Sequence, residues 1–149
     1  MDNTQAISTL NSLIETLKDG EEGFRTAADG LTDPQTKAAF QKYSVERAQM
    51  AQELQAEVRA LGGDPEKAGS VSGSLHRGWI NIKSVVTGKN DASIIAEAER
   101  GEDIAKKAYE EASRAGLPTA ASAVVSRQAT QVRSAHDWVR SMERAATTH

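Results

Sequence analysis

Carboxylate and imidazole side chains give this sequence its clearest capacity for chemistry, because helical metal centres bind iron and manganese through these donors. The candidate donors are Glu21, Glu46, Glu102 and His136, which all lie in segments with helical periodicity. A di-metal carboxylate centre takes one Glu from each of two helices and a Glu-x-x-His motif from each of the other two. The chain contains no Glu-x-x-His, since Gly73, Arg133 and Ala146 stand three positions before its three histidines.

Two segments look like this motif with its ligands replaced, namely Glu46-x-x-Gln49 and Arg133-x-x-His136. Arg47 lies within the first of these segments, and its positive charge would repel a divalent cation. We therefore expect no metal and no other cofactor. The alternative that stays open is an iron or manganese site formed by Glu21, Glu46, Glu102 and His136.

Polar side chains also interrupt each of four apolar helical stripes near mid-length. They are Glu21, Arg47 and Glu102, with Gln128 and Gln131 on the last stripe. Counting from the expected turns brings Glu21, Glu102 and Gln131 or Gln128 to one level, with Arg47 roughly 4.5–9 Å from it at 1.5 Å per residue. Buried carboxylates need a cation, and Arg47 supplies one. We predict a buried layer of ion pairs and hydrogen bonds, with Arg47 within reach of Glu21 or Glu102.

Four long helices must hold these side chains. Prolines, glycines and N-cap residues place them at about 3–29, 34–61, 91–115 and 118–146. Each carries a one-sided apolar stripe at 3-4 spacing, which favours a four-helix bundle with shallow crossing angles. Two short connections and the long connection 62–90 put the second and third helices parallel, as in ferritin-like bundles. The predicted fold is an all-α, ferritin-like four-helix bundle that forms a single domain over residues 1–149.

The long connection contains one further expected helix, about 72–87, because apolar residues recur there at helical spacing. These residues are Leu75, Trp79, Ile82 and Val86. We interpret them as an anchor that fixes the crossover on the outside of the bundle, and we predict that Trp79 is largely buried. The alternative for the segment Leu75-His76-Arg77-Gly78-Trp79 is a small anion site or a partner-docking surface.

Composition narrows the classes of function. The net charge is −3 and there is no cysteine, so we expect no nucleic-acid partner, no disulfide and no thiolate metal site. No apolar run approaches the roughly 18 residues of a membrane span, and no membrane partner is expected. The opening residues lack the features of a signal peptide, so we expect a cytoplasmic protein. The alanine-rich face of helix 91–115 allows either close helix approach or a homo-oligomer seam.

Several segments carry a resemblance to a known family. They are Asp19-Gly20-Glu21-Glu22-Gly23-Phe24, Glu46-Arg47-Ala48, Gly73-Ser74-Leu75-His76-Arg77-Gly78-Trp79 and Glu99-Arg100-Gly101-Glu102-Asp103, together with Tyr109. In these segments the chain resembles a bacterial family of small four-helix-bundle proteins of unknown function in the ferritin-like superfamily. The resemblance covers nearly the whole chain and implies that fold, but no activity. We predict a non-enzymatic bacterial bundle that acts through its surface or as a homo-oligomer, with a di-metal carboxylate protein as the alternative.

Overall fold

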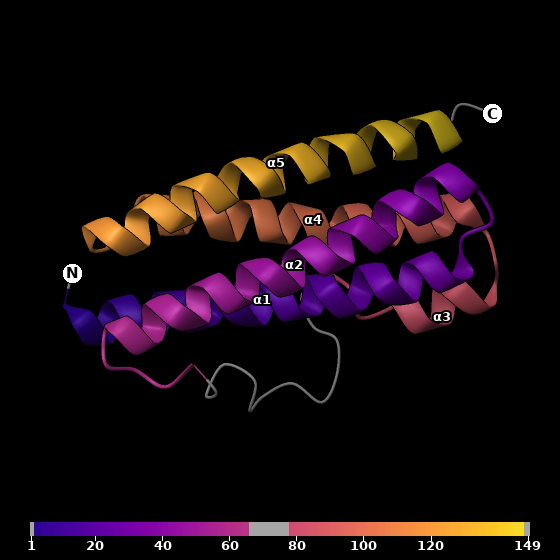
Figure 1. Ribbon diagram of the computed structural model, residues 1–149. Helices are drawn as coiled ribbons and strands as arrows, with labels where there is room; N and C mark the ends of the chain where they lie inside the picture. The colour runs from indigo at the N-terminus through magenta and orange to yellow at the C-terminus, as the bar shows by residue number, and fades with distance from the viewer. Residues whose placement is uncertain (1, 66–77, 148–149) are drawn as a thin grey trace.

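The computed structural model describes residues 2–65 and 78–147, and all regular structure in these residues is helical. The described helices are α1 (Asn3–Gly30), α2 (Pro34–Ala60), α3 (Ile82–Thr87), α4 (Asp91–Ser113) and α5 (Thr119–Thr147) (Figure 1). The protein is all-α, as predicted, and the bounds of its long helices differ from the predicted ranges by at most two residues. No helix in the described part of the chain is long and apolar enough to cross a lipid bilayer.

Side-chain caps fix where α2 and α4 begin. The Asp33 carboxylate accepts a hydrogen bond from the backbone amide of Thr36 at 2.9 Å, and Pro34 occupies the first helical position. The side-chain oxygen of Asn90 accepts in the same way from the Ser93 amide at 3.0 Å. Each cap satisfies an amide that has no partner within its own helix, which explains why these boundaries could be predicted from the residue types.

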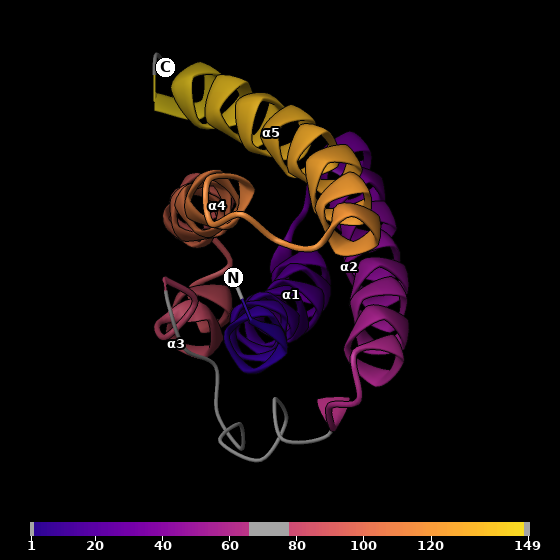
Figure 2. The same ribbon diagram turned by 90° about the vertical axis from the view of Figure 1, so that its left-hand side faces the viewer.

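The four long helices pack as two antiparallel hairpins, α1 with α2 and α4 with α5 (Figures 1 and 2). Helix α1 also lies beside α4, and α2 beside α5, so α2 and α4 occupy one diagonal of the bundle. The amide of Thr32, in the α1–α2 turn, donates to the Asp91 carboxylate at 2.9 Å. Helices α2 and α4 therefore begin at the same end of the bundle and run parallel, as the long crossover predicts.

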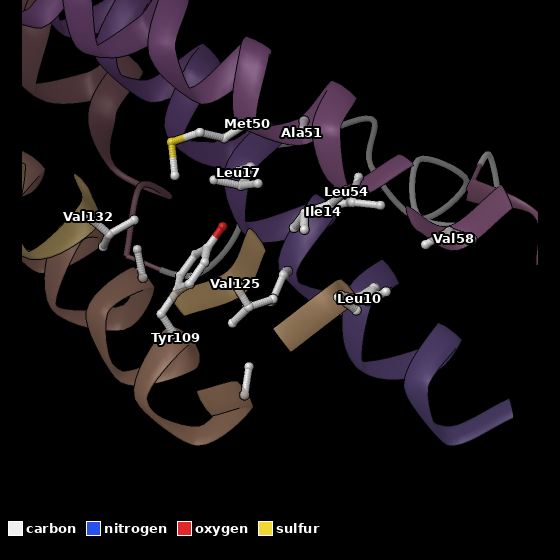
Figure 3. Packing of buried hydrophobic residues seen from close by; sticks show 14 residues of the cluster. Leu10, Ile14, Leu17, Met50, Ala51, Leu54, Val58, Tyr109, Val125 and Val132 are labelled. Carbon is white, nitrogen blue, oxygen red and sulfur yellow. The ribbon is translucent and has the colours of Figure 1, made fainter. Parts of the chain in front are cut away.

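Two apolar clusters fill the interior. The aliphatic cluster lies toward the start of α1 and includes Leu10, Ile14, Leu17, Leu54, Val58 and Val125 (Figure 3). The aromatic cluster lies toward the start of α4 and holds five of the six aromatic residues of the chain, which are Phe24, Phe40, Tyr43, Trp79 and Trp138. Along α1, α2 and α4 the boundary between the clusters falls at Gly20, Arg47 and Glu102, so a polar level separates two apolar regions.

The alanine-rich face of α4 is turned inward. Ala98, Gly101, Ala105 and Ala112 are all buried within the bundle. Burial of these four residues fits close helix approach, whereas Ala108 of the same face is half-buried.

The short helix of the crossover begins later than predicted. Helix α3 starts at Ile82, whereas residues 78–81 form a turn, so the expectation of a helix over 72–87 is wrong for this part. Gly78 has a φ of +88°, a left-handed conformation that interrupts a helix. Trp79 is only 2% exposed, which confirms its predicted burial. Residues 66–77, including Leu75, His76 and Arg77, lie outside the described residues.

Candidate functional site

The centre of the bundle holds a buried ion pair between Arg47 of α2 and Glu102 of α4. The guanidinium donates two parallel hydrogen bonds, from Nη1 to Oε2 at 2.7 Å and from Nη2 to Oε1 at 2.5 Å. Arg47 is 2% exposed and Glu102 is fully buried. Burial acts to lower the pKa of Arg47, but the Glu102 carboxylate outweighs burial and raises that pKa above its ordinary value. Arg47 is therefore held in its charged form.

The ion pair spans the diagonal of the bundle. Helices α2 and α4 have no backbone contact within the described residues, so the long Arg47 side chain bridges the two backbones. The guanidinium passes close to α1 at Gly20, where an added Cβ would lie 3.1 Å from Nη1. Its Cζ also lies 5.3 Å from the centre of the Phe24 ring, a cation–π distance. Three of the four long helices thus meet around a single guanidinium.

A second polar group lies deeper in the aliphatic cluster and is organised by Gln128 of α5, which is fully buried. The Tyr109 hydroxyl donates to Oε1 of Gln128 at 2.7 Å. Nε2 of Gln128 donates to the Met50 carbonyl at 3.1 Å and to the Glu53 carboxylate at 3.0 Å. Glu53 in turn pairs with Arg127 at the surface. Burial raises the pKa of Tyr109 far above its ordinary value, so its hydroxyl stays protonated and can donate.

The predicted polar layer is partly wrong. Gln131 is exposed and Glu21 is only half-buried, so neither belongs to the central polar level. On α1 the inward position between Leu17 and Phe24 belongs to Gly20, which leaves space for the guanidinium. On α5 the buried stripe passes through Gln128, and residue 131 points away from it.

The stripe on α5 explains the error. Its buried positions are Ala121, Val125, Gln128, Val132, Ala135, His136 and Val139. Position 128 lies on this stripe and position 131 lies off it, so only one of the two predicted glutamines is buried. Gln128 is buried but bonds to Tyr109, not to the Arg47–Glu102 pair.

The described residues do not fit a di-metal centre. Both oxygens of Glu102 are bonded to Arg47, and the Glu46 side chain is 30% exposed beside Lys42. His136 is 2% exposed, but its ring nitrogens face the carboxylates of Asp103, at 2.6 Å, and Asp137, at 3.0 Å. In the described ranges 2–65 and 78–147, no three His, Asp or Glu side chains converge in a way that could hold a metal ion.

Sequence reasoning missed three residues of these sites. Gly20 escaped notice because a residue without a side chain gives no signal in a hydrophobic pattern. Asp103 and Glu53 escaped notice because they lie on polar helix faces, where most carboxylates are solvated. Asp103 and Glu53 can be recognised as partners of His136 and Gln128 only from the positions of these residues along the bundle axis. These positions depend on how the helices pack.

Comparison with known proteins places the chain in a family without assigning an activity. No curated protein matches the sequence. Residues 5–115 match the model of a family described as a domain of unknown function, DUF2383. The matched range includes Phe24, Arg47, Trp79 and Glu102, whereas α5 with Gln128 and His136 lies beyond it. The match covers well over half of the chain, and the protein accordingly belongs to the DUF2383 family of unknown function.

Proposed function

We propose that this protein is a non-enzymatic bundle of the ferritin-like type in which an ion pair replaces the metal centre. The observation that carries the proposal is the bidentate Arg47–Glu102 contact, at 2.7 and 2.5 Å, in the middle of the bundle. Ferritin-like metal proteins use inward carboxylates from their helices at this level to surround cations. Here the guanidinium supplies the positive charge that the buried carboxylate requires.

The energetics of exchange support this proposal. An incoming metal ion would have to displace Arg47 from Glu102 and leave a guanidinium buried without its partner. Breaking a buried pair in this way costs about 3–5 kcal/mol. Binding of iron or manganese offsets such a cost only when several carboxylate or imidazole donors converge on the metal ion. Here Glu21 and Glu46 are partly exposed, and His136 is bonded to Asp103.

The groove between α1 and α4 also supports a role other than catalysis. A groove of about 400 Å³ lies between α1 and α4 and is lined by Leu13, Ala108 and Ala112 with hydroxyl side chains of α1. Among its lining residues only Glu111 is titratable. An enzyme site brings several titratable groups to one pocket, and this groove holds one. We therefore infer that the protein acts by presenting its surface to a partner or to further copies of itself.

Metal titration tests the proposal directly. Protein purified without a tag is titrated anaerobically with Fe²⁺ or Mn²⁺ and then exposed to oxygen, and we expect neither stoichiometric binding nor ferroxidase turnover. Two metal ions per chain, lost in Glu102→Ala or Glu21→Ala, would contradict the proposal. Glu110→Gln is the matched control, because Glu110 also lies on α4 but is exposed. Binding that disappears equally in the control reports adsorption to surface carboxylates.

A further inference from the structure

The indole of Trp79 lies in a flat slot between two helix backbones. A Cβ added to Gly23 of α1 would overlap atoms of the indole ring, and so would a Cβ added to Gly101 of α4. These two residues therefore leave just enough space for a planar ring to pass between α1 and α4. The ring packs edge-on against Phe24, with the ring centres 5.0 Å apart. We call the space between Gly23, Gly101 and Phe24 the Trp79 slot.

The backbone on both sides of Trp79 is fixed to α4. Gly78 lies against the α4 backbone, where an added Cβ would be 2.8 Å from the Arg100 carbonyl oxygen. The amide of Asn81 donates to the Glu97 carboxylate at 2.7 Å. Glu97 is 3% exposed and also pairs with Arg100 at 3.1 Å. These contacts hold the Trp79 backbone at the mouth of the slot and direct its side chain inward.

The slot adjoins the central ion pair. Gly20 and Gly23 lie one turn apart on α1, and the guanidinium of Arg47 lies against the first while the indole lies against the second. On α4 the slot residue Gly101 directly precedes Glu102. Phe24 touches both groups, since its ring packs against the indole and lies 5.3 Å from the Arg47 Cζ. The indole, Phe24 and the guanidinium thus form one continuous row of contacts beside α1.

We propose that the Trp79 slot is a binding site for a planar aromatic ring, filled by Trp79 of the same chain, and that the ring keeps water from the Arg47–Glu102 pair. The slot has flat walls because both are glycine backbone, and it is apolar because Phe24 forms its inner end. A buried ion pair gains most when water is excluded, since the attraction between the charges grows as the local dielectric constant falls. This proposal does not depend on whether the protein binds a metal.

The first experiment tests the slot with Gly101→Ala in two backgrounds. In the wild-type background the new methyl group conflicts with the indole, so we expect a lower urea midpoint. In the Trp79→Ala background the space is empty and alanine favours a helix over glycine, so the same change should raise the midpoint or leave it unaltered. A loss of similar size in both backgrounds would overturn the slot.

Two further measurements keep this test decisive. In Trp138→Phe, Trp79 is the only tryptophan, and Gly101→Ala should shift its emission to the red as the indole leaves the slot. Unchanged emission would count against the slot.

Free indole should raise the unfolding midpoint of Trp79→Ala but not of Trp79→Ala/Gly101→Ala, where the methyl group occupies the space. An equal response of the two variants to indole would contradict an aromatic-binding site.

The second experiment tests water exclusion through the exchange of the Arg47 guanidinium protons with solvent, followed by ¹⁵N NMR and assigned by the loss of the signal in Arg47→Met. We expect exchange at least about tenfold faster in Trp79→Leu than in wild type. Trp138→Leu is the matched control, because Trp138 belongs to the same aromatic cluster but does not line the slot. Trp79→Leu that stays folded by circular dichroism with unchanged Arg47 exchange, or equal acceleration in the control, would overturn this role of Trp79.

Discussion

The backbone amide of Asp33 donates to a carboxylate oxygen of Asp91 at 2.9 Å, which ties the N-cap residue of α2 to the first residue of α4. The two helices run parallel from this common level. Arg47 is 14 residues beyond Asp33 and Glu102 is 11 residues beyond Asp91, so their backbones differ in height by roughly 4.5 Å at 1.5 Å per residue. An arginine side chain covers this difference, and the contact at one end of the bundle thereby sets the ion pair at its centre.

Removing the Asp91 carboxylate should weaken the whole bundle. This carboxylate accepts hydrogen bonds from the Thr32 amide and hydroxyl, at 2.9 and 3.0 Å, besides the one from Asp33. We expect Asp91→Ala to lower the free energy of unfolding by about 1–2 kcal/mol in urea denaturation. Asp91→Asn keeps one accepting oxygen and should cost less. Asp29→Ala removes an exposed carboxylate near the same turn and is the control; an equal effect of Asp29→Ala and Asp91→Ala would contradict this role.

Arg47→Met should be among the most destabilising single changes in the protein. It leaves the fully buried Glu102 carboxylate without a counter-charge, and breaking a buried pair costs about 3–5 kcal/mol. Urea denaturation at neutral pH measures this loss. A loss below about 0.5 kcal/mol, the usual range for surface changes, would mean that Arg47 is solvated in solution.

The matched control for this prediction is the double variant Arg47→Met/Glu102→Leu. Replacing both charges with apolar groups of similar size removes the unpaired carboxylate, so this variant should be more stable than Arg47→Met alone. Failure to recover stability would show that Arg47→Met acts through lost packing against Phe24 and not through the stranded charge.

Much of the architecture could be predicted because helix ends and helix faces leave local signals. Asp33 with Pro34 and Asn90 with Asp91 mark starts that depend only on nearby residues, and the common level of these starts placed Arg47 near Glu102 in advance. The predicted contact between Arg47 and a seam carboxylate is present in the structure. These features require no knowledge of how the helices rotate against one another.

The remaining details depend on how each helix is rotated about its axis and shifted along it, and both are determined by how the helices pack. An apolar stripe is broad enough to admit either Gly20 or Glu21 as the inward residue, and in the structure Gly20 is the one that lies against the Arg47 guanidinium. The stripe on α5 likewise admits Val124 or Val125. The start of α3 follows Gly78, whose left-handed backbone lies against Arg100 of α4, a contact between segments that no local pattern contains.

Gln128→Leu should reveal the second polar group. The change leaves the buried Tyr109 hydroxyl without its acceptor at 2.7 Å, and an unsatisfied buried group costs about 1–3 kcal/mol. Thermal or urea denaturation measures the loss. In the Tyr109→Phe background the hydroxyl is absent, so Gln128→Leu should cost distinctly less there. Equal losses in the two backgrounds would show that the Tyr109–Gln128 hydrogen bond contributes nothing measurable to stability.

Glu53 gives a prediction about pH. The hydrogen bonds from Arg127 and, to a smaller extent, from Gln128 hold the pKa of Glu53 below its ordinary value of 4.5. A carboxylate with a lowered pKa in the folded state stabilises the fold above its unfolded-state pKa, and this contribution is lost as the pH falls through the folded-state pKa. Glu53→Gln should therefore be less stable than wild type at pH 7, and the difference between the two should shrink between about pH 5 and pH 3.

Arg127→Met removes the main cause of the lowered pKa of Glu53 and should weaken this pH dependence. Urea midpoints measured across the pH range test the prediction, and a difference between wild type and Glu53→Gln that stays constant from pH 7 to pH 3 would show that Glu53 keeps its ordinary pKa in the folded protein.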